Sequence, residues 1–117
     1  MKKIINPYVI SAIFLLAACS KGGSGSSGTT DPCAGLSVKF STNIQPTVNT
    51  SCATNASCHA TGSVNSGGPL TDYNKIFAKR AEIKFQVESG FMPKTGSITA
   101  TEKTNIICWV NSGAPNN

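Results

Sequence analysis

Two of the chain's five cysteines and its only histidine lie within the eight residues from Cys52 to His59. The segment reads Cys52-Ala-Thr-Asn-Ala-Ser-Cys58-His59, so the histidine directly follows the second cysteine. A fold that uses these three side chains together must hold them in one short loop and build the rest of the domain around it. No other stretch of the sequence constrains the fold as strongly.

A cysteine followed directly by histidine is typical of covalent haem attachment. The cysteine thiols add to the porphyrin vinyl groups, and the histidine becomes the proximal ligand of the iron. The usual motif has two residues between the cysteines, whereas this chain has five. We predict that Cys52, Cys58 and His59 bind one haem c per chain. Attachment through Cys58 alone stays open, because only the Cys52 bond depends on the longer spacer.

Residues 1–18 have the form of an export signal. A basic start, Met1-Lys2-Lys3, precedes an apolar run that ends in Leu-Ala-Ala before Cys19. This order of basic, apolar and small residues is typical of a secretory signal, and the run is too short to span a bilayer as a helix. The Leu-Ala-Ala-Cys ending resembles the lipobox of bacterial lipoproteins, which implies cleavage before Cys19 and a lipid on that cysteine. The alternative is an ordinary secretory signal with a chance cysteine.

Residues 19–32 are rich in glycine and serine and predict a flexible tether, which leaves residues 33–117 as the folded domain. A domain this short has a small core and often needs a disulfide or a cofactor for stability. The net charge of +5 falls to +3 when the two lysines of the signal are removed. That charge is too small and too scattered to indicate nucleic-acid binding.

Apolar spacing and capping residues predict an all-α domain. A first helix is expected to start near Phe40, with Ser41, Thr42 or Asn43 as its N-cap, and to run toward Cys52. Residues 60–69 are expected to form a loop, followed by one helix from about 73 to 80, capped by Thr71 or Asp72, and a second one ending near 89.

The last helix has the clearest signal. Thr99 and Glu102 have the spacing of a capping box, and Gly113 is suited to end the helix after Asn111. This segment also has the highest apolar content of the folded domain, including Trp109. We expect it to pack on the first helix, with Trp109 closing one side of the core.

Met92 is the only methionine apart from the initiator, and it lies in a loop between Gly90 and Pro93. A lone methionine is usually a core residue. A thioether is also a soft ligand suited to haem iron, where a His/Met pair raises the reduction potential. Beside the cysteine–histidine motif, we favour Met92 as the second axial ligand of the iron.

The cysteine count is consistent with an exported protein. With Cys19 assigned to lipid and Cys52 and Cys58 to haem, Cys33 and Cys108 remain and are predicted to form a disulfide. The competing assignment pairs Cys52 with Cys58 and leaves no haem.

The segment from Phe40 to Asn117 resembles a class I cytochrome c, specifically the small lipoprotein cytochromes c of Gram-negative bacteria. The resemblance rests on Ile44-Gln45-Pro46, Cys58-His59, Leu70 to Tyr73, Met92-Pro93 and Trp109 to Ala114. It implies an all-α domain whose N- and C-terminal helices cross around a haem cleft. Carried over by position, Cys52 and Cys58 hold the porphyrin, His59 the proximal face of the iron and Met92 the distal face.

The favoured function is therefore a membrane-tethered electron carrier that exchanges electrons with redox partner proteins. We expect no enzyme activity, because the sequence offers no catalytic constellation. Lipid on Cys19 would place the protein in the cell envelope of a Gram-negative bacterium, facing the periplasm or the cell surface. A basic strip of Lys75, Lys79, Arg80 and Lys84 is either a solvated helix face or a docking patch for an acidic partner.

Two other functions stay open. The first is a haem-free, disulfide-bonded lipoprotein that serves as a surface or assembly module. The second is a zinc site built from Cys52, Cys58 and His59, which lacks a fourth ligand and has a spacing unlike structural zinc motifs.

Overall fold

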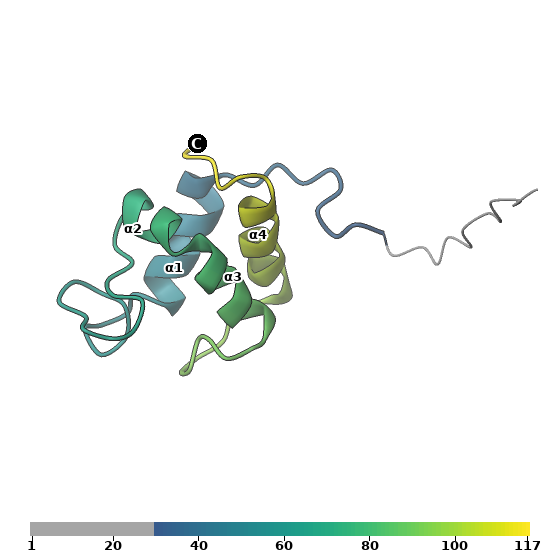
Figure 1. The fold of residues 1–117 in the computed structure, drawn as a ribbon. Helices are drawn as coiled ribbons and strands as arrows, with labels where there is room; N and C mark the ends of the chain where they lie inside the picture. The colour runs from purple at the N-terminus through teal and green to yellow at the C-terminus, as the bar shows by residue number, and fades with distance from the viewer. Residues whose placement is uncertain (1–29) are drawn as a thin grey trace, which may run out of the picture.

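The computed structural model describes residues 30–117. The predicted signal, the predicted lipidation site Cys19 and most of the predicted tether lie outside the described residues. Within residues 30–117 the secondary structure is helical and contains no strand, which confirms the all-α prediction at this level (Figure 1). The helices are η1 (Phe40–Ile44, a π-helical turn), α1 (Gln45–Ser51), α2 (Tyr73–Ala78), α3 (Arg80–Glu88) and α4 (Ala100–Asn111).

Helix α4 begins and ends as its sequence predicts. The Thr99 hydroxyl accepts a hydrogen bond from the Glu102 amide at 3.1 Å, and the Glu102 carboxylate accepts one from the Thr99 amide at 2.7 Å. This reciprocal pair satisfies two amide groups that a helix start leaves without partners. The chain leaves the helix through Gly113, whose φ of 95° is accessible to glycine at little cost.

The two helices predicted between residues 73 and 89 are also present. Asp72 is the cap of α2, because its side chain accepts a hydrogen bond from the Lys75 amide at 3.1 Å. A break at Lys79 separates α2 from α3, where the backbone leaves helical geometry with φ −105° and ψ 7°.

The predicted cap of the first helix is wrong. Neither Ser41, Thr42 nor Asn43 caps it, because the helical turn already begins at Phe40. The Phe40 amide donates to the Asn117 side-chain oxygen at 2.8 Å, and the Ser41 amide donates to the Asn117 carbonyl at 2.9 Å. A residue 77 positions away therefore supplies the acceptors that a local cap would offer.

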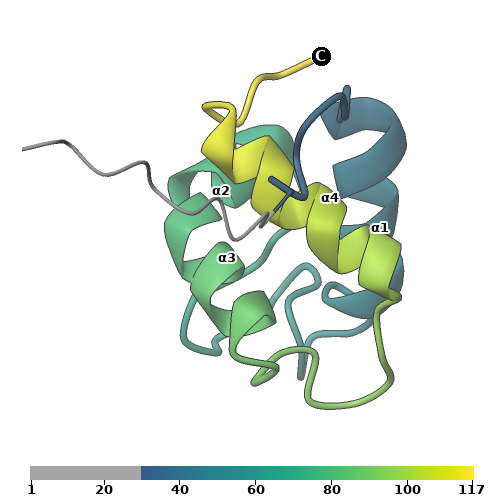
Figure 2. The same ribbon diagram turned by 90° about the vertical axis from the view of Figure 1, so that its right-hand side faces the viewer.

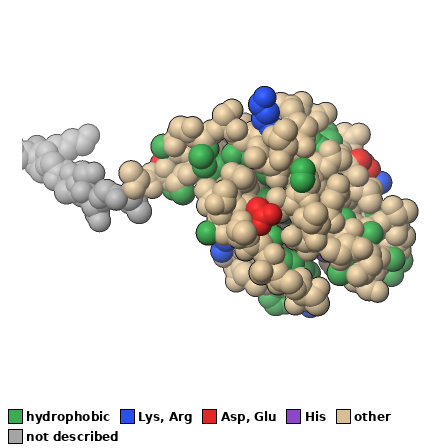
Figure 3. All heavy atoms as spheres, turned by 180° about the vertical axis from the view of Figure 1, so that it is seen from behind, with side chains coloured by type: hydrophobic (Ala, Val, Ile, Leu, Met, Phe, Trp, Pro, Cys, Tyr) green, Lys and Arg blue, Asp and Glu red, His purple; other side chains and the backbone are tan. Residues whose placement is uncertain are grey.

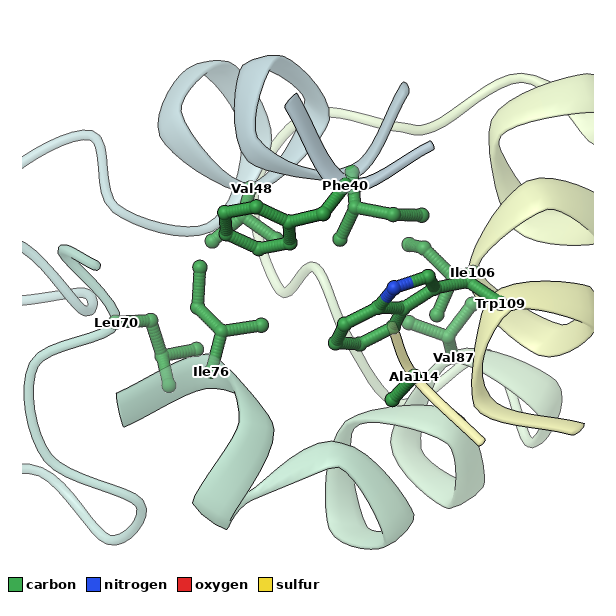
Figure 4. Packing of buried hydrophobic residues seen from close by; sticks show 9 residues of the cluster. Phe40, Val48, Leu70, Ile76, Val87, Ile106, Trp109 and Ala114 are labelled. Carbon is green, nitrogen blue, oxygen red and sulfur yellow. The ribbon is translucent and has the colours of Figure 1, made fainter. Parts of the chain in front are cut away.

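The core lies between η1–α1 and α4 and is extended by α2 and α3. Figure 2 shows α4 beside the first helical segment, and Figure 4 shows the Trp109 indole pointing from α4 into the middle of the buried cluster. The indole is fully buried and donates its N–H to the Pro115 carbonyl at 2.9 Å, so its one polar atom is satisfied. The buried residues of this cluster are Phe40, Ile44, Val48, Leu70, Ile76, Val87, Ile106, Trp109 and Ala114.

A disulfide joins Cys33 to Cys108 and closes a segment with a sequence separation of 75. It ties the non-helical segment ahead of η1 to the last turn of α4, with 5.3 Å between the two Cα atoms. None of the helices in the described part of the chain has the length and apolar content needed to cross a lipid bilayer.

Candidate functional site

One cavity of about 560 Å³ is lined by all four residues that the sequence assigns to a haem site, namely Cys52, Cys58, His59 and Met92. His59 and Met92 are more than thirty positions apart in the sequence, so the fold and not the local chain brings them together. The walls come from the end of α1, the segment that follows it, α3, and the segment between α3 and α4. Apolar wall residues include Leu70, Ile83, Val87 and Phe91.

The five-residue spacer between the cysteines folds back on itself. Cys52 ends α1, with its amide donating to the Val48 carbonyl at 2.9 Å. The Cys58 amide donates to both the backbone oxygen and the side-chain oxygen of Asn55, at 3.0 and 3.1 Å. The His59 amide then donates to the Cys52 carbonyl at 3.0 Å. The longer spacer thus forms a closed turn, and Cys52 and His59 remain joined by a hydrogen bond.

The His59 ring is held in one tautomer. Its Nδ1 lies 2.9 Å from the Gly68 carbonyl, and because a carbonyl only accepts hydrogen bonds, Nδ1 carries the proton. In the neutral ring Nε2 is then left with a free lone pair, which is the atom that a metal binds. Gly67 lies against the same ring, where an added Cβ would come within 3.5 Å of the His59 Cε1 atom.

Cys52 and Cys58 carry separate thiols and are not bonded to each other. Cys52 packs against the apolar core, and this burial, with a smaller contribution from Cys58, raises the pKa of the Cys52 thiol to about 11. The Cys52 side chain is therefore a neutral thiol at neutral pH. Cys58 lies in the partly exposed loop that precedes His59.

Met92 lies in the segment between α3 and α4 and is half-buried. The amides of Phe91 and Met92 both donate to the Gln86 carbonyl, at 3.0 and 3.1 Å, which turns the chain at the end of α3. The peptide bond between Met92 and Pro93 is cis. The thioether is thus part of the cavity wall and not of the nine-residue core cluster.

The basic strip is largely neutralised by its own neighbours. Lys75 pairs with Asp72 at 2.7 Å, Lys79 with Glu82 at 3.6 Å, and Lys84 with Glu88 at 3.8 Å. The Arg80 guanidinium lies over the Phe77 ring, 4.0 Å from its centroid. On the face shown in Figure 3, charged side chains are few and separated. These contacts favour the solvated helix face over a docking patch.

Residues to which the sequence analysis assigned no role hold the Cys52–His59 segment in place. Asn55 closes the turn within this segment, and Ser63, Asn65 and Gly68 hydrogen-bond to it from the loop that follows. Asparagine, serine and glycine are ordinary turn residues, so their identity alone indicates only a loop. The Met92 segment is anchored by the backbone carbonyl of Gln86, which any residue of α3 would supply.

No group of three or more His, Cys, Asp or Glu side chains converges as a possible metal site among residues 30–117. No protein-family model matches the chain, and comparison with curated proteins and with solved structures finds no match either.

Proposed function

We propose that this protein is a membrane-tethered electron carrier of the cytochrome c type, with one covalently attached haem c and His59 and Met92 as axial ligands. The observation that carries the proposal is the single cavity lined by two thiols, an imidazole and a thioether. Each of these groups has a separate place in haem binding, and no other cavity-lining set in the described residues combines them.

The cavity fits such a group in size and chemistry. Its volume of about 560 Å³ lies within the range of about 300–1,000 Å³ typical of ligand and cofactor sites. Leu70, Ile83 and Val87 give it apolar walls, as a porphyrin ring requires. The hydrogen bond from His59 Nδ1 to Gly68 leaves Nε2 available and raises its basicity as a ligand.

The four residues would have two different roles in binding haem. Cys52 and Cys58 would hold the porphyrin through thioether bonds, with Cys52 fixed at the end of α1 and Cys58 in the turn. His59 and Met92 would bind the iron, and the apolar wall would exclude water from it. When bound, haem supplies a one-electron couple between ferrous and ferric iron. The protein contributes binding, orientation and tuning of the potential.

Cys19, as a lipidated residue, would anchor the carrier in the cell envelope of a Gram-negative bacterium, facing the periplasm or the cell surface. Residues 20–32 would act as the tether, and redox proteins in the same compartment would be its partners.

The test is export of the full chain in cells that contain the haem-attachment machinery, followed by haem staining of a denaturing gel. We expect a stained band and a mass increase of one haem, reduced in Cys58→Ala more than in Cys52→Ala. An unstained chain with a disulfide between Cys52 and Cys58 would contradict the proposal and support the haem-free alternative.

A further inference from the structure

Residues 60–70 hold the Cys58–His59 pair from outside the loop that runs from Cys52 to His59. The Cys58 carbonyl accepts two hydrogen bonds from this segment, one from the Ser63 hydroxyl and one from the Asn65 side-chain amide at 3.0 Å. The same Asn65 amide also donates to the Ser57 carbonyl. One asparagine side chain therefore holds the two consecutive peptide groups that flank the Cα atom of Cys58.

Asn65 also connects to the His59 ring through its backbone. The Gly68 amide donates to the Asn65 carbonyl at 2.8 Å, and the Gly68 carbonyl accepts the His59 Nδ1 proton at 2.9 Å. The Leu70 amide closes the same segment by donating to the His59 carbonyl at 2.7 Å. One residue thus links the backbone of the second cysteine to the group that orients the imidazole.

The long spacer explains why such a link is needed. Residues 54–57 are exposed, and Cys52 is fixed at the end of α1. A spacer of five residues between Cys52 and Cys58 restricts the second cysteine less than a spacer of two, because a longer loop has more conformations. The covalent link to Cys52 is therefore not enough to fix the position of Cys58 and His59. Non-covalent contacts with other parts of the chain must do so.

We propose that Asn65, assisted by Ser63, is the positioning residue that fixes Cys58 and the His59 ring relative to each other. This inference rests on the proposed haem function. The hydrogen bonds of Asn65 go to the Ser57 and Cys58 carbonyls and to the Gly68 amide, so it acts on the cysteine and the imidazole through the backbone.

The experiment compares Asn65→Asp, Asn65→Ala and Val64→Ala in the full chain, isolated with its haem. Asn65→Asp keeps the size of the side chain and removes both N–H donors. Val64 is the matched control, because its side chain is adjacent in sequence and 97% exposed. The first readout is the proton NMR pattern of the haem methyl groups in the oxidised protein, which reports the orientation of the imidazole plane. The second is hydrogen exchange of the His59 and Leu70 amides.

We expect both Asn65 variants to change the haem-methyl pattern and to accelerate exchange at His59 and Leu70 at least tenfold, while Val64→Ala leaves both unchanged. Ser63→Ala, which removes one donor to the same carbonyl, should move both readouts in the same direction by less. Thermal unfolding, monitored by circular dichroism, identifies any variant that does not fold. If an Asn65 variant does not fold, the result for Ser63→Ala tests the positioning role instead.

If Asn65→Asp has the same haem-methyl pattern and exchange rates as Val64→Ala, Asn65 is not a positioning residue. The proposed function would be unaffected by that result. A wild-type chain without covalent haem would overturn the proposed function, and this inference with it.

Discussion

The two cavity segments that carry the candidate axial ligands are built differently. On the His59 side, the backbone amide, the carbonyl and the ring of the histidine each have a hydrogen-bond partner, in Cys52, Leu70 and Gly68 respectively. On the Met92 side, the described hydrogen bonds of residues 91–98 are those of the Phe91 and Met92 amides, and both end on the Gln86 carbonyl.

The His59 segment is thus ordered before any ligand binds, whereas the Met92 segment can change its conformation more easily. Breaking one hydrogen bond on the His59 side leaves two others, whereas the two hydrogen bonds of residues 91–98 share one acceptor and are lost together. Local opening needs least free energy where few contacts hold the backbone. The histidine would thus be the fixed ligand and the methionine the exchangeable one.

The largest effect is expected from His59→Ala. Loss of a group that merely orients a metal-binding histidine costs about 10–100-fold in metal affinity, and removal of the histidine should cost at least as much. We expect haem content, measured as the absorbance of the reduced protein per chain, to fall at least tenfold. Haem content equal to that of the wild type would show that His59 is not the fixed ligand.

Met92→Ala should have a smaller and different effect. The covalent haem should stay, the methionine–iron charge-transfer band of the oxidised protein should disappear, and the reduction potential should fall, because a His/Met pair raises it. Potentiometry with optical detection measures both.

The control for Met92→Ala is Ser97→Ala, because Ser97 is an exposed residue of the same segment that does not line the cavity; this variant should leave the band in place. If the charge-transfer band persists in Met92→Ala, Met92 is not an axial ligand. The comparison between the His59 and Met92 segments would then no longer concern two ligands.

The disulfide allows a test that should affect neither segment. Replacing both Cys33 and Cys108 by serine should lower the free energy of unfolding by about 4 kcal/mol, the loop-entropy value for a closed segment of this length. Neither cysteine lines the main cavity, so the haem spectrum should not change.

Urea denaturation in parallel with visible spectra measures the two quantities for the double serine variant. A spectral change without loss of stability would mean that the disulfide shapes the cavity.

The smallest effect is expected at the start of α4, where the Met92 segment ends. Thr99→Ala removes the N-cap hydroxyl and should cost about 1 kcal/mol of stability. If the Met92 segment is the adaptable one, this variant should also accelerate exchange of methionine for added imidazole, while the His59 side is unaffected. Stopped-flow measurement of imidazole binding provides the test.

Acid titration of stability checks the same cap. The Thr99 backbone amide, and then its hydroxyl, lower the pKa of Glu102 from its ordinary value of 4.5. A carboxyl with a lowered pKa in the folded state contributes stability above its unfolded pKa and loses it as the pH falls through the folded one. The wild type should therefore lose more stability below pH 4.5 than Glu102→Gln. An equal loss of stability in the two proteins as the pH falls would contradict this prediction.

The sequence predicts those elements whose signals lie within one helical turn. Thr99 and Glu102 are three positions apart, and Asp72 lies three positions before the Lys75 amide that it accepts from. The start of the first helix could not be predicted in the same way, because its acceptors come from Asn117. A cap of this kind depends on the completed fold.

The same distinction applies to the site. Rare residue types marked the cavity-lining groups: one histidine, one methionine beyond the initiator, and two cysteines beside the histidine. Asn65 and Gly68 carry no such mark, because asparagine and glycine are frequent in any turn. Their role depends on where the loop folds back, which is a tertiary property.

The bond between Cys33 and Cys108 also determines how the domain would bear a mechanical load. A pull on the chain ahead of residue 33 would pass through the two sulfur atoms directly into the last turn of α4. The covalent path bypasses Phe40 to Ser51, so the first helix and the cavity wall that follows it would carry none of the force. Tension applied through the chain ahead of Cys33 would therefore not unfold the domain from its N-terminal end.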